Sequence, residues 1–438
     1  MLVSKRKRYL SGHDWVIHTL DHMMKSVTNS GNMSQIVLML NAPLDEHEIR
    51  SRLNHFVRRF PVIQGAVARD FKLTPYWKIP ASAEHGVTVN VSYAADMSPG
   101  DNLLHGLAKN ANSSFRDDNE HIAFHFFQNN HRSSLAMTFD HRLFDARGAE
   151  SFLNLFRQSM DNDSLSGDIT FTSSMALTQW KRKFLAGRRV NRRVIALSKA
   201  TPKTLPLVYG RDRGFKYRLL NFSKQETKDI YDRAYCEAGY LMESPYFLAV
   251  ITKTFHDLFS SLCDTGTSYV IPVTTDFRPG QDPLQEVFFN HVSYLFYQIP
   301  VRDADDMKVL IASFKQQMYD QVKSGFMKDL AEASLLTRIA PPRLLGRLLY
   351  IPMKGKMATF AFSHLGKSSY ESKTFMGSAI SSLFHMPRVP IPPGIGFFSN
   401  YYNDQLNMVI SYIDGLLADD QVDLLEAGIR RGFGVSQA

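Results

Sequence analysis

Cysteine and long apolar runs are both scarce in this sequence. Of its 438 residues only two are cysteines, Cys236 and Cys263, and neither belongs to a CxxC pair. This excludes a disulfide framework and fits a reducing compartment. No window approaches the roughly 20 apolar residues that a membrane-spanning helix needs, and no apolar stretch follows the basic start of the chain. We therefore expect a soluble, cytoplasmic protein.

Signatures of tightly bound cofactors are also missing. The sequence has no P-loop, no GxGxxG and no His/Cys spacing typical of a metal site. We expect neither a metal nor a resident cofactor. With 44% hydrophobic and 21% charged residues the composition is that of a globular protein, and the length predicts two or three domains.

Acidic residues are rare in one segment of the chain. The formal net charge is +9, yet twelve Lys or Arg and a single acid, Asp212, lie between Lys181 and Lys216, so the remainder is close to neutral. Such a segment suggests an acidic partner, which could be CoA phosphates, a carrier protein, a membrane surface or nucleic acid. A solvated linker without a partner is the alternative. Little aromatic interleaving and no recognised motif argue against nucleic acid.

Periodicity predicts alternating strands and helices in the first part of the chain. Residues 34–40 are typical of a buried strand. Asp45 followed by Glu48 indicates a helix start of the capping-box type. Residues 121–128 and 134–139 are typical of two strands joined by a hairpin turn.

A similar order of elements begins again near Gly214. Residues 216–222 indicate a strand, and Ser223 with Glu226 repeats the capping-box pattern. A long apolar helix follows at 243–262. Two halves with the same order of elements suggest an internal duplication.

The predicted organisation is an N-terminal lobe over residues 1–168, a basic crossover linker over 169–214, and a C-terminal lobe over 215–438. A short helix is expected in the linker near Trp180. Residues 342–356 are basic and apolar; we interpret them as a partly exposed packing helix, with peripheral membrane contact as the alternative.

The segment DHRLFDARG, residues 140–148, is the candidate for chemistry. It pairs His141 with Asp145 at H-x-x-x-D spacing, and chance placement of 15 His and 30 Asp gives about one such pair. Its position raises its significance, because it follows an apolar strand and precedes an amphipathic helix. A side chain at a strand end can project from a rigid scaffold into a cleft, as a general base must.

The segment TFDHRLFDARG resembles the active-site motif of the CoA-dependent acyltransferase superfamily. That superfamily includes chloramphenicol acetyltransferase, dihydrolipoamide acyltransferases, condensation domains of nonribosomal peptide synthesis, wax ester synthases and polyketide-associated acyltransferases. Its motif is HHxxxDG, or DHRxxDG in the lipoamide enzymes. Further segments resemble the family in the same order: FVRRFPVIQGAV (56–67), VTTDFRPG (273–280), FFNHVSYLFYQIP (288–300) and FSHLG (362–366).

The resemblance implies an α/β fold of two similar chloramphenicol-acetyltransferase-like lobes. Each lobe would be a mixed β-sheet with flanking helices, and the active-site channel would run between them. The implied activity moves an acyl group from acyl-CoA or a phosphopantetheinyl carrier-protein thioester to an alcohol or amine. His141 would be the general base, Asp145 a structural residue, and Arg278 its partner across the lobes.

Further residues are implied to line the channel or to stabilise a developing oxyanion: Thr275, Asn290, Ser363 and His364. Ala146 replaces the glycine of the family motif. This departure leaves a second hypothesis open, a catalytically inactive condensation-like module that binds a carrier protein or another acidic partner. Of the remaining histidines, we expect His125 in the core and His385 on a loop surface near prolines.

Overall fold

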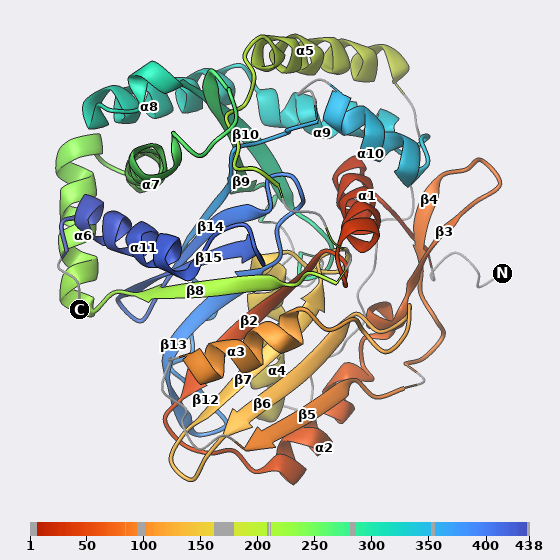
Figure 1. Ribbon diagram of the computed structural model, residues 1–438. Coiled ribbons are helices and arrows are strands. Elements are labelled where there is room, and N and C mark those ends of the chain that lie inside the picture. The colour runs from red at the N-terminus through yellow and green to blue at the C-terminus, as the bar shows by residue number, and fades with distance from the viewer. Residues whose placement is uncertain are drawn as a thin grey trace.

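The computed structural model describes residues 7–83, 85–93, 101–161, 179–207, 210, 212–280, 286–351 and 355–435. Within these residues two six-stranded mixed sheets carry the architecture, and helices cover their outer faces (Figure 1). The two-lobed α/β fold class predicted from the sequence is confirmed.

The first sheet is built mainly from the N-terminal part of the chain. Its strand order is β12 (Thr374–Phe375), β13 (Ser378–Pro387), β2 (Met33–Leu40), β7 (Ser133–Asp140), β6 (Ile122–Gln128) and β5 (Thr88–Tyr93). β2, β7 and β6 are antiparallel, as the predicted hairpin requires, and β5 joins β6 in parallel.

Strand β2 is buried on both faces, and its side chains divide between two cores. Ile36 and Leu38 pack into the cluster that contains α2 (Glu46–Val57) and α4 (Ala146–Asp161), whereas Val37 and Met39 point into the cluster shared with the second sheet. This alternation follows from the two-residue period of a strand. A central strand between two layers therefore contains few polar residues.

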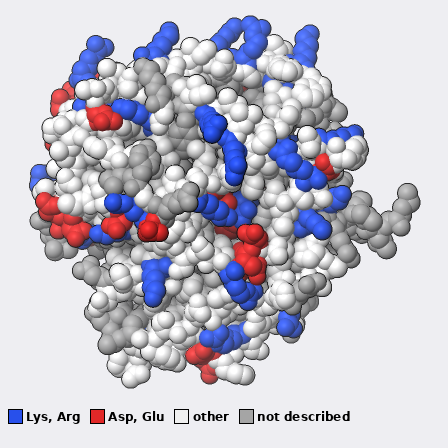
Figure 2. Space-filling model, turned by 45° about the vertical axis from the view of Figure 1, so that its right-hand side comes forward, with Lys and Arg blue, Asp and Glu red and all other residues white. Residues whose placement is uncertain are grey.

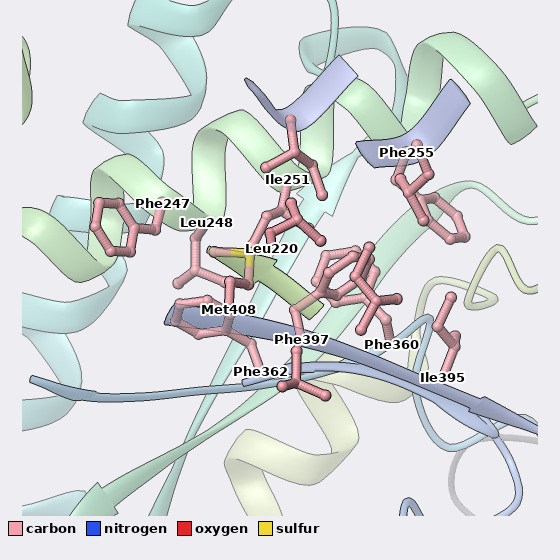
Figure 3. Close-up of a cluster of buried hydrophobic side chains, with 14 of the residues drawn as sticks. Leu220, Phe247, Leu248, Ile251, Phe255, Phe360, Phe362, Ile395, Phe397 and Met408 are labelled. Atoms are coloured by element: carbon pink, nitrogen blue, oxygen red, sulfur yellow. The ribbon is translucent and has the colours of Figure 1, made fainter. Parts of the chain in front are cut away.

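The second sheet has the order β10 (Val292–Pro300), β9 (Ser268–Asp276), β11 (Ala361–Lys367), β14 (Ile395–Tyr402), β15 (Gln405–Ile413) and β8 (Phe215–Asn221). Helix α7 (Glu243–Phe259) packs on its outer face. Figure 3 shows the aromatic and aliphatic side chains that fill this interface, including Phe255, Phe360 and Phe397. The FSHLG segment, residues 362–366, lies within strand β11.

Strands β12 and β13 cross from the C-terminal part of the chain into the first sheet. β13 pairs antiparallel with β2, with Leu383 opposite Leu38. The stretch 215–438, taken from sequence as one lobe, therefore supplies strands to both sheets. The reason is physical: β13 covers the edge of β2, which would otherwise present unpaired backbone groups beside a buried face. His385 lies on β13 and is buried, so the loop-surface prediction for it is wrong.

A small third sheet and further helices complete the fold. The sheet has the order β1 (Lys7–Tyr9), β4 (Pro75–Lys78) and β3 (Ala66–Arg69). Short 3-10 turns lie at Pro61–Gln64 and Val301–Asp303. The remaining helices are α1 (Gly12–Val27), α3 (Asp101–Ala111), α6 (Lys224–Ala238), α8 (Met307–Lys323), α9 (Phe326–Thr337), α10 (Pro342–Tyr350) and α11 (Asp419–Phe433). Both predicted caps are present: Asp45 and Ser223 accept from the backbone N–H of Glu48 and Glu226.

The basic linker contains helix α5 (Trp180–Ser198), which is much longer than the short helix predicted. It packs against α9 at the upper edge of the view in Figure 1. The predicted boundary at residues 168 and 169 lies outside the described residues. Within the described part of the chain, no helix combines the length and apolar character needed to cross a membrane.

Candidate active site

His141 lies one residue beyond the end of β7, where the two sheets face each other. Its backbone N–H donates to the carbonyl of Asn32 at 3.0 Å, which fixes the start of the motif loop beside β2. The imidazole is partly exposed and lines a cavity of about 140 Å³. Loop residues of the first lobe and strands β9, β11 and β14 of the second form its walls. The backbone that carries the ring is therefore held in place, and the ring itself is accessible from the cavity.

The side chain of Asn290 determines which nitrogen of His141 carries the proton. Its amide nitrogen donates to the carbonyl oxygen of His141 at 2.7 Å, and its amide oxygen lies 3.0 Å from Nδ1. The reverse orientation of the amide would set two oxygens against each other. Because an amide oxygen only accepts, Nδ1 carries a hydrogen and Nε2 keeps its lone pair. Asn290 thus lies behind the ring, as the group that orients it.

Asp145 ties the motif loop to the second lobe. Its carboxylate forms an ion pair with Arg278 and accepts from the backbone N–H of His291 at 2.9 Å and of Gly148 at 2.8 Å. Burial lowers the pKa of Arg278, but the charge of Asp145 and their hydrogen bond outweigh it, so that the pKa is raised. The structure brings Arg278 and Asp145 together, in the arrangement that the family resemblance implied.

Gly148, two positions later than the glycine of the family motif, has a packing role. A Cβ at this residue would lie 2.3 Å from the carbonyl oxygen of Val287, which is backbone and cannot yield. The segment that carries Asn290 therefore approaches helix α4 as closely as it does because residue 148 has no side chain. Ala146 begins the helix with ordinary backbone angles, so it needs no glycine.

A buried ionic network underlies the loop. Asp140 accepts from Arg142 at 2.5 Å and lies 3.0 Å from Nδ1 of His121, whose Nε2 lies 2.8 Å from the carbonyl of Gly65. The carboxylate of Asp140 and the carbonyl of Gly65 thus hold the ring of His121 from both sides. Burial raises the pKa of Asp140, yet the charge of Arg142 and the hydrogen bond from His121 hold it well below its usual value. Asp140 thus anchors the loop from below.

Hydroxyl groups line the opposite wall of the cavity. Ser363 on β11 accepts from the hydroxyl of Thr274 at 2.7 Å, which leaves its own O–H to donate elsewhere. Thr275, which the sequence singled out, also lines the cavity, and its hydroxyl contacts the sulfur of Met327 at 3.3 Å. The sequence missed Thr274, because successive strand residues point to opposite faces and the register was unknown.

His364 lies at the junction of two hollows. It lines the cavity at His141 and also a larger, open hollow of about 880 Å³. Its Nδ1 is 2.9 Å from the hydroxyl of Ser399, and its ring packs edge-on against Phe247. Burial, assisted by the charge of Arg147, lowers its pKa to about 4. His364 is therefore neutral near pH 7.

A buried carboxylate–imidazole pair borders the same cavity and was not foreseen. Oε1 of Glu150 on α4 lies 3.0 Å from Nε2 of His385 on β13, which lines the cavity. Oε2 accepts from the backbone and the hydroxyl of Ser369, both at 2.7 Å, and from Arg147 at 3.1 Å. Burial raises the pKa of Glu150, but His385 and Arg147 outweigh it and lower the value to about 2. Only the pairing of β13 with the first sheet reveals this contact.

The described residues contain no group of three or more His, Cys, Asp or Glu side chains placed to hold a metal ion. His125 is buried on β6, 3.4 Å from the amide of Asn90, and burial lowers its pKa to about 4. It is a core histidine, as predicted.

We predict that Glu150→Gln removes part of the dependence of stability on pH. The carboxyl has a pKa of about 2 in the folded chain against 4.5 ordinarily. It therefore stabilises the fold fully above pH 4.5, by about 3 kcal/mol, and this is lost as pH falls toward 2. Urea unfolding at several pH values should show wild type losing its advantage over the variant as pH falls. A difference that stays constant with pH would contradict this.

Gly148→Ala should displace the segment that carries Asn290. We expect a loss of stability of about 1–3 kcal/mol, since backbone must move to admit the methyl group. The matched control is Gly187→Ala in helix α5, where a Cβ meets no atom within 4 Å. There we expect no loss and a gain of up to about 1 kcal/mol from helix propensity. Thermal unfolding of both variants measures the contrast; equal effects would refute the packing role.

Known structures share this architecture. Trichothecene 15-O-acetyltransferase TRI3 from Fusarium sporotrichioides is 13% identical, with a TM-score of 0.70 over 98% of this chain and 95% of that one. The first condensation domain of the calcium-dependent antibiotic synthetase is 13% identical, with a TM-score of 0.67 over 98% and 96%. The EpoB cyclization-docking bidomain from Sorangium cellulosum is 11% identical, with a TM-score of 0.67 over 99% and 86%.

Sequence comparison adds nothing to this likeness, since neither the protein-family models nor the curated proteins yield a match. At identities of 11–13% the similarity concerns the fold. The chain therefore has the two-lobed fold of these condensation domains and of the trichothecene acetyltransferase.

Proposed function

We propose that this protein is an acyltransferase that moves an acyl group from a thioester to an alcohol or amine, with His141 as general base. The observation that carries the proposal is the tautomer of His141. Asn290 holds the hydrogen on Nδ1, so the nitrogen with the lone pair belongs to a partly exposed ring in an inter-lobe cavity. An imidazole held in this orientation at such a place is the arrangement that general-base catalysis requires.

The reaction proceeds by direct transfer in this proposal. Nε2 of His141 takes the proton of the acceptor hydroxyl or amine as its oxygen or nitrogen attacks the thioester carbonyl. The carbon–sulfur bond then breaks, and the imidazolium returns the proton to the thiolate. No covalent enzyme intermediate is needed.

The negative oxygen of the tetrahedral intermediate needs a hydrogen-bond donor. Ser363 is our candidate, because Thr274 donates to its oxygen and leaves the Ser363 hydrogen available on the cavity wall. His364 is neutral and borders the same space, so it contributes polarity without a competing charge. Asp145 and Arg278 act through the placement of the loop.

The shape of the hollow suggests where the donor lies. The cavity of about 140 Å³ is smaller than the roughly 300–1,000 Å³ of pockets that enclose a drug-sized ligand. It accommodates only the reacting groups, and a short acyl chain suits it. The adjoining hollow of about 880 Å³ is lined by three lysines and three acids: Lys224, Lys228, Lys367, Asp232, Glu243 and Asp404. Lys224 lies 3.5 Å from Asp404, so Lys228 and Lys367 are our candidates for meeting the phosphates of CoA or of a carrier protein's phosphopantetheine.

His141→Ala should abolish acyl transfer while leaving the fold intact. Removal of a general base typically lowers the rate about 10²–10⁴-fold. Release of free thiol from acetyl-CoA, with a panel of alcohols and amines as acceptors, measures the loss. The control is His131→Ala, an exposed histidine in the turn between β6 and β7, which should release thiol at the wild-type rate.

Two results would contradict the proposal. Equal thiol release by wild type and His141→Ala would remove His141 from the reaction. A folded wild type that releases no thiol from acyl-CoA or from acylated carrier protein, yet binds the carrier, would support the inactive module instead.

Asn290→Ala should lower turnover without abolishing it. The ring would lose the partner that fixes its tautomer and direction, and we expect a fall in kcat of about 10–100-fold with little change in KM. Asn290→Gln keeps the amide but moves it by one methylene, so it should fall between wild type and Ala. Thiol-release kinetics measure both variants. A wild-type kcat in Asn290→Ala would reject the orienting role.

A further inference from the structure

Helix α5 carries two different kinds of cation on its two faces. On the inner face, Arg189 pairs with Asp329 of α9, Arg182 pairs with Glu332 at 2.8 Å, and Arg193 donates to the carbonyl of Phe296. The sequence of α5 contains no acid over its 19 residues. Its charge is therefore balanced only where it meets α9.

The cations of the outer face have no such balance. Lys181, Arg188 and Arg192 are exposed and form no ion pair with any described residue. Arg188 and Arg192 lie four positions apart, where like charges repel and weaken a helix. Figure 2 shows Lys and Arg gathered along the upper edge of the molecule, at the height of α5 in Figure 1. A helix that was merely solvated would gain from acids at these positions.

Large apolar side chains are interspersed among these cations. Phe184 is 59% exposed and Trp180 43% exposed, and their rings stack with centroids 6.0 Å apart. Leu185 and Ile195 are also exposed. From Trp180 to Ile195 the strip extends about 22 Å along the helix. Cations mixed with exposed aromatic and aliphatic side chains are typical of a helix that lies in a membrane interface.

We propose that the outer face of α5 docks on the surface of an anionic lipid bilayer. The cations would meet lipid phosphates, and the rings of Trp180 and Phe184 would enter the headgroup region. Helix α5 lies at the upper edge of the molecule, a position that leaves its outer face open to a flat partner (Figure 1). Helix α5 would lie on the bilayer, since no helix of the described chain can span it. The inference is independent of the proposed acyl transfer.

Helix α10 shows the same combination at this end of the molecule (Figure 1). It follows α9 after residues 338–341, and it exposes Leu344 and Leu348 beside Arg343 and Arg347. Membrane contact was the alternative that the sequence left open for residues 342–356, of which 352–354 lie outside the described residues.

Trp180 provides the measurement. The other two tryptophans, Trp15 and Trp77, are 2% and 1% exposed, so Trp180 dominates any response to the surroundings. Vesicles of phosphatidylcholine alone and of an equal mixture with phosphatidylglycerol are added to the full-length protein. We expect co-sedimentation and a blue shift of tryptophan emission with the mixed vesicles alone, both weakened by salt. Trp180→Phe should bind without the shift.

Matched variants separate the contributions. Arg188→Gln with Arg192→Gln should weaken binding to mixed vesicles on the order of 30-fold, since each basic residue near an anionic surface contributes about fivefold. The control removes the same charge from exposed sites elsewhere, with Lys72→Gln and Arg302→Gln. It should bind nearly as wild type does.

Phe184→Ser should weaken binding, whereas Phe71→Ser, which alters a side chain that is 91% exposed elsewhere, should not. Several results would overturn the proposal: no sedimentation with mixed vesicles, equal losses in the α5 variants and their controls, or an emission shift with duplex DNA or an acidic carrier protein but not with vesicles.

Discussion

The site depends on contacts that cross between the lobes in both directions. Asn290, from the second lobe, holds the ring of His141 in the first, while Asp145, from the first, holds Arg278 and the backbone of His291 in the second. Each lobe thus fixes the residue that the other needs. Because a misplacement of about 1 Å can cost about 10²-fold in rate, this mutual hold restricts how far the lobes can move if the chemistry is to proceed.

Buried charge surrounds this junction, and its cost requires an explanation. Asp140 with Arg142 and His121 lies beneath the loop, and Glu150 with His385 lies at the start of the motif helix. Buried ion pairs often contribute less to stability than apolar residues of the same volume. What they provide here is direction: each carboxylate accepts two or more hydrogen bonds from different parts of the chain. A loop without regular structure is thereby given one conformation.

Local signals were sufficient for the elements and for the position of the motif. The cap at Asp45, the strand at 34–40 and the hairpin before His141 are written in short stretches of sequence, and each is present. The pairing of β13 with β2 joins residues more than 300 positions apart, and no local pattern encodes it. His385 was misplaced for this reason. Thr274 was missed because the sequence does not show which side chains of a strand point toward the cavity; that depends on how the strand is placed in its sheet.

Helix α5 illustrates the same limit with charge. Twelve basic residues were visible between Lys181 and Lys216, but the sequence could not separate those that pair with acids of α9 from those that face solvent. Arg188 and Arg189 are adjacent in the chain, but successive helix positions point about 100° apart. Arg189 therefore pairs with Asp329 of α9, whereas Arg188 faces solvent. The unbalanced half is also the half that exposes Trp180 and Phe184. The face of α5 that points away from α9 therefore combines cations without an ion-pair partner among the described residues and exposed aromatic rings.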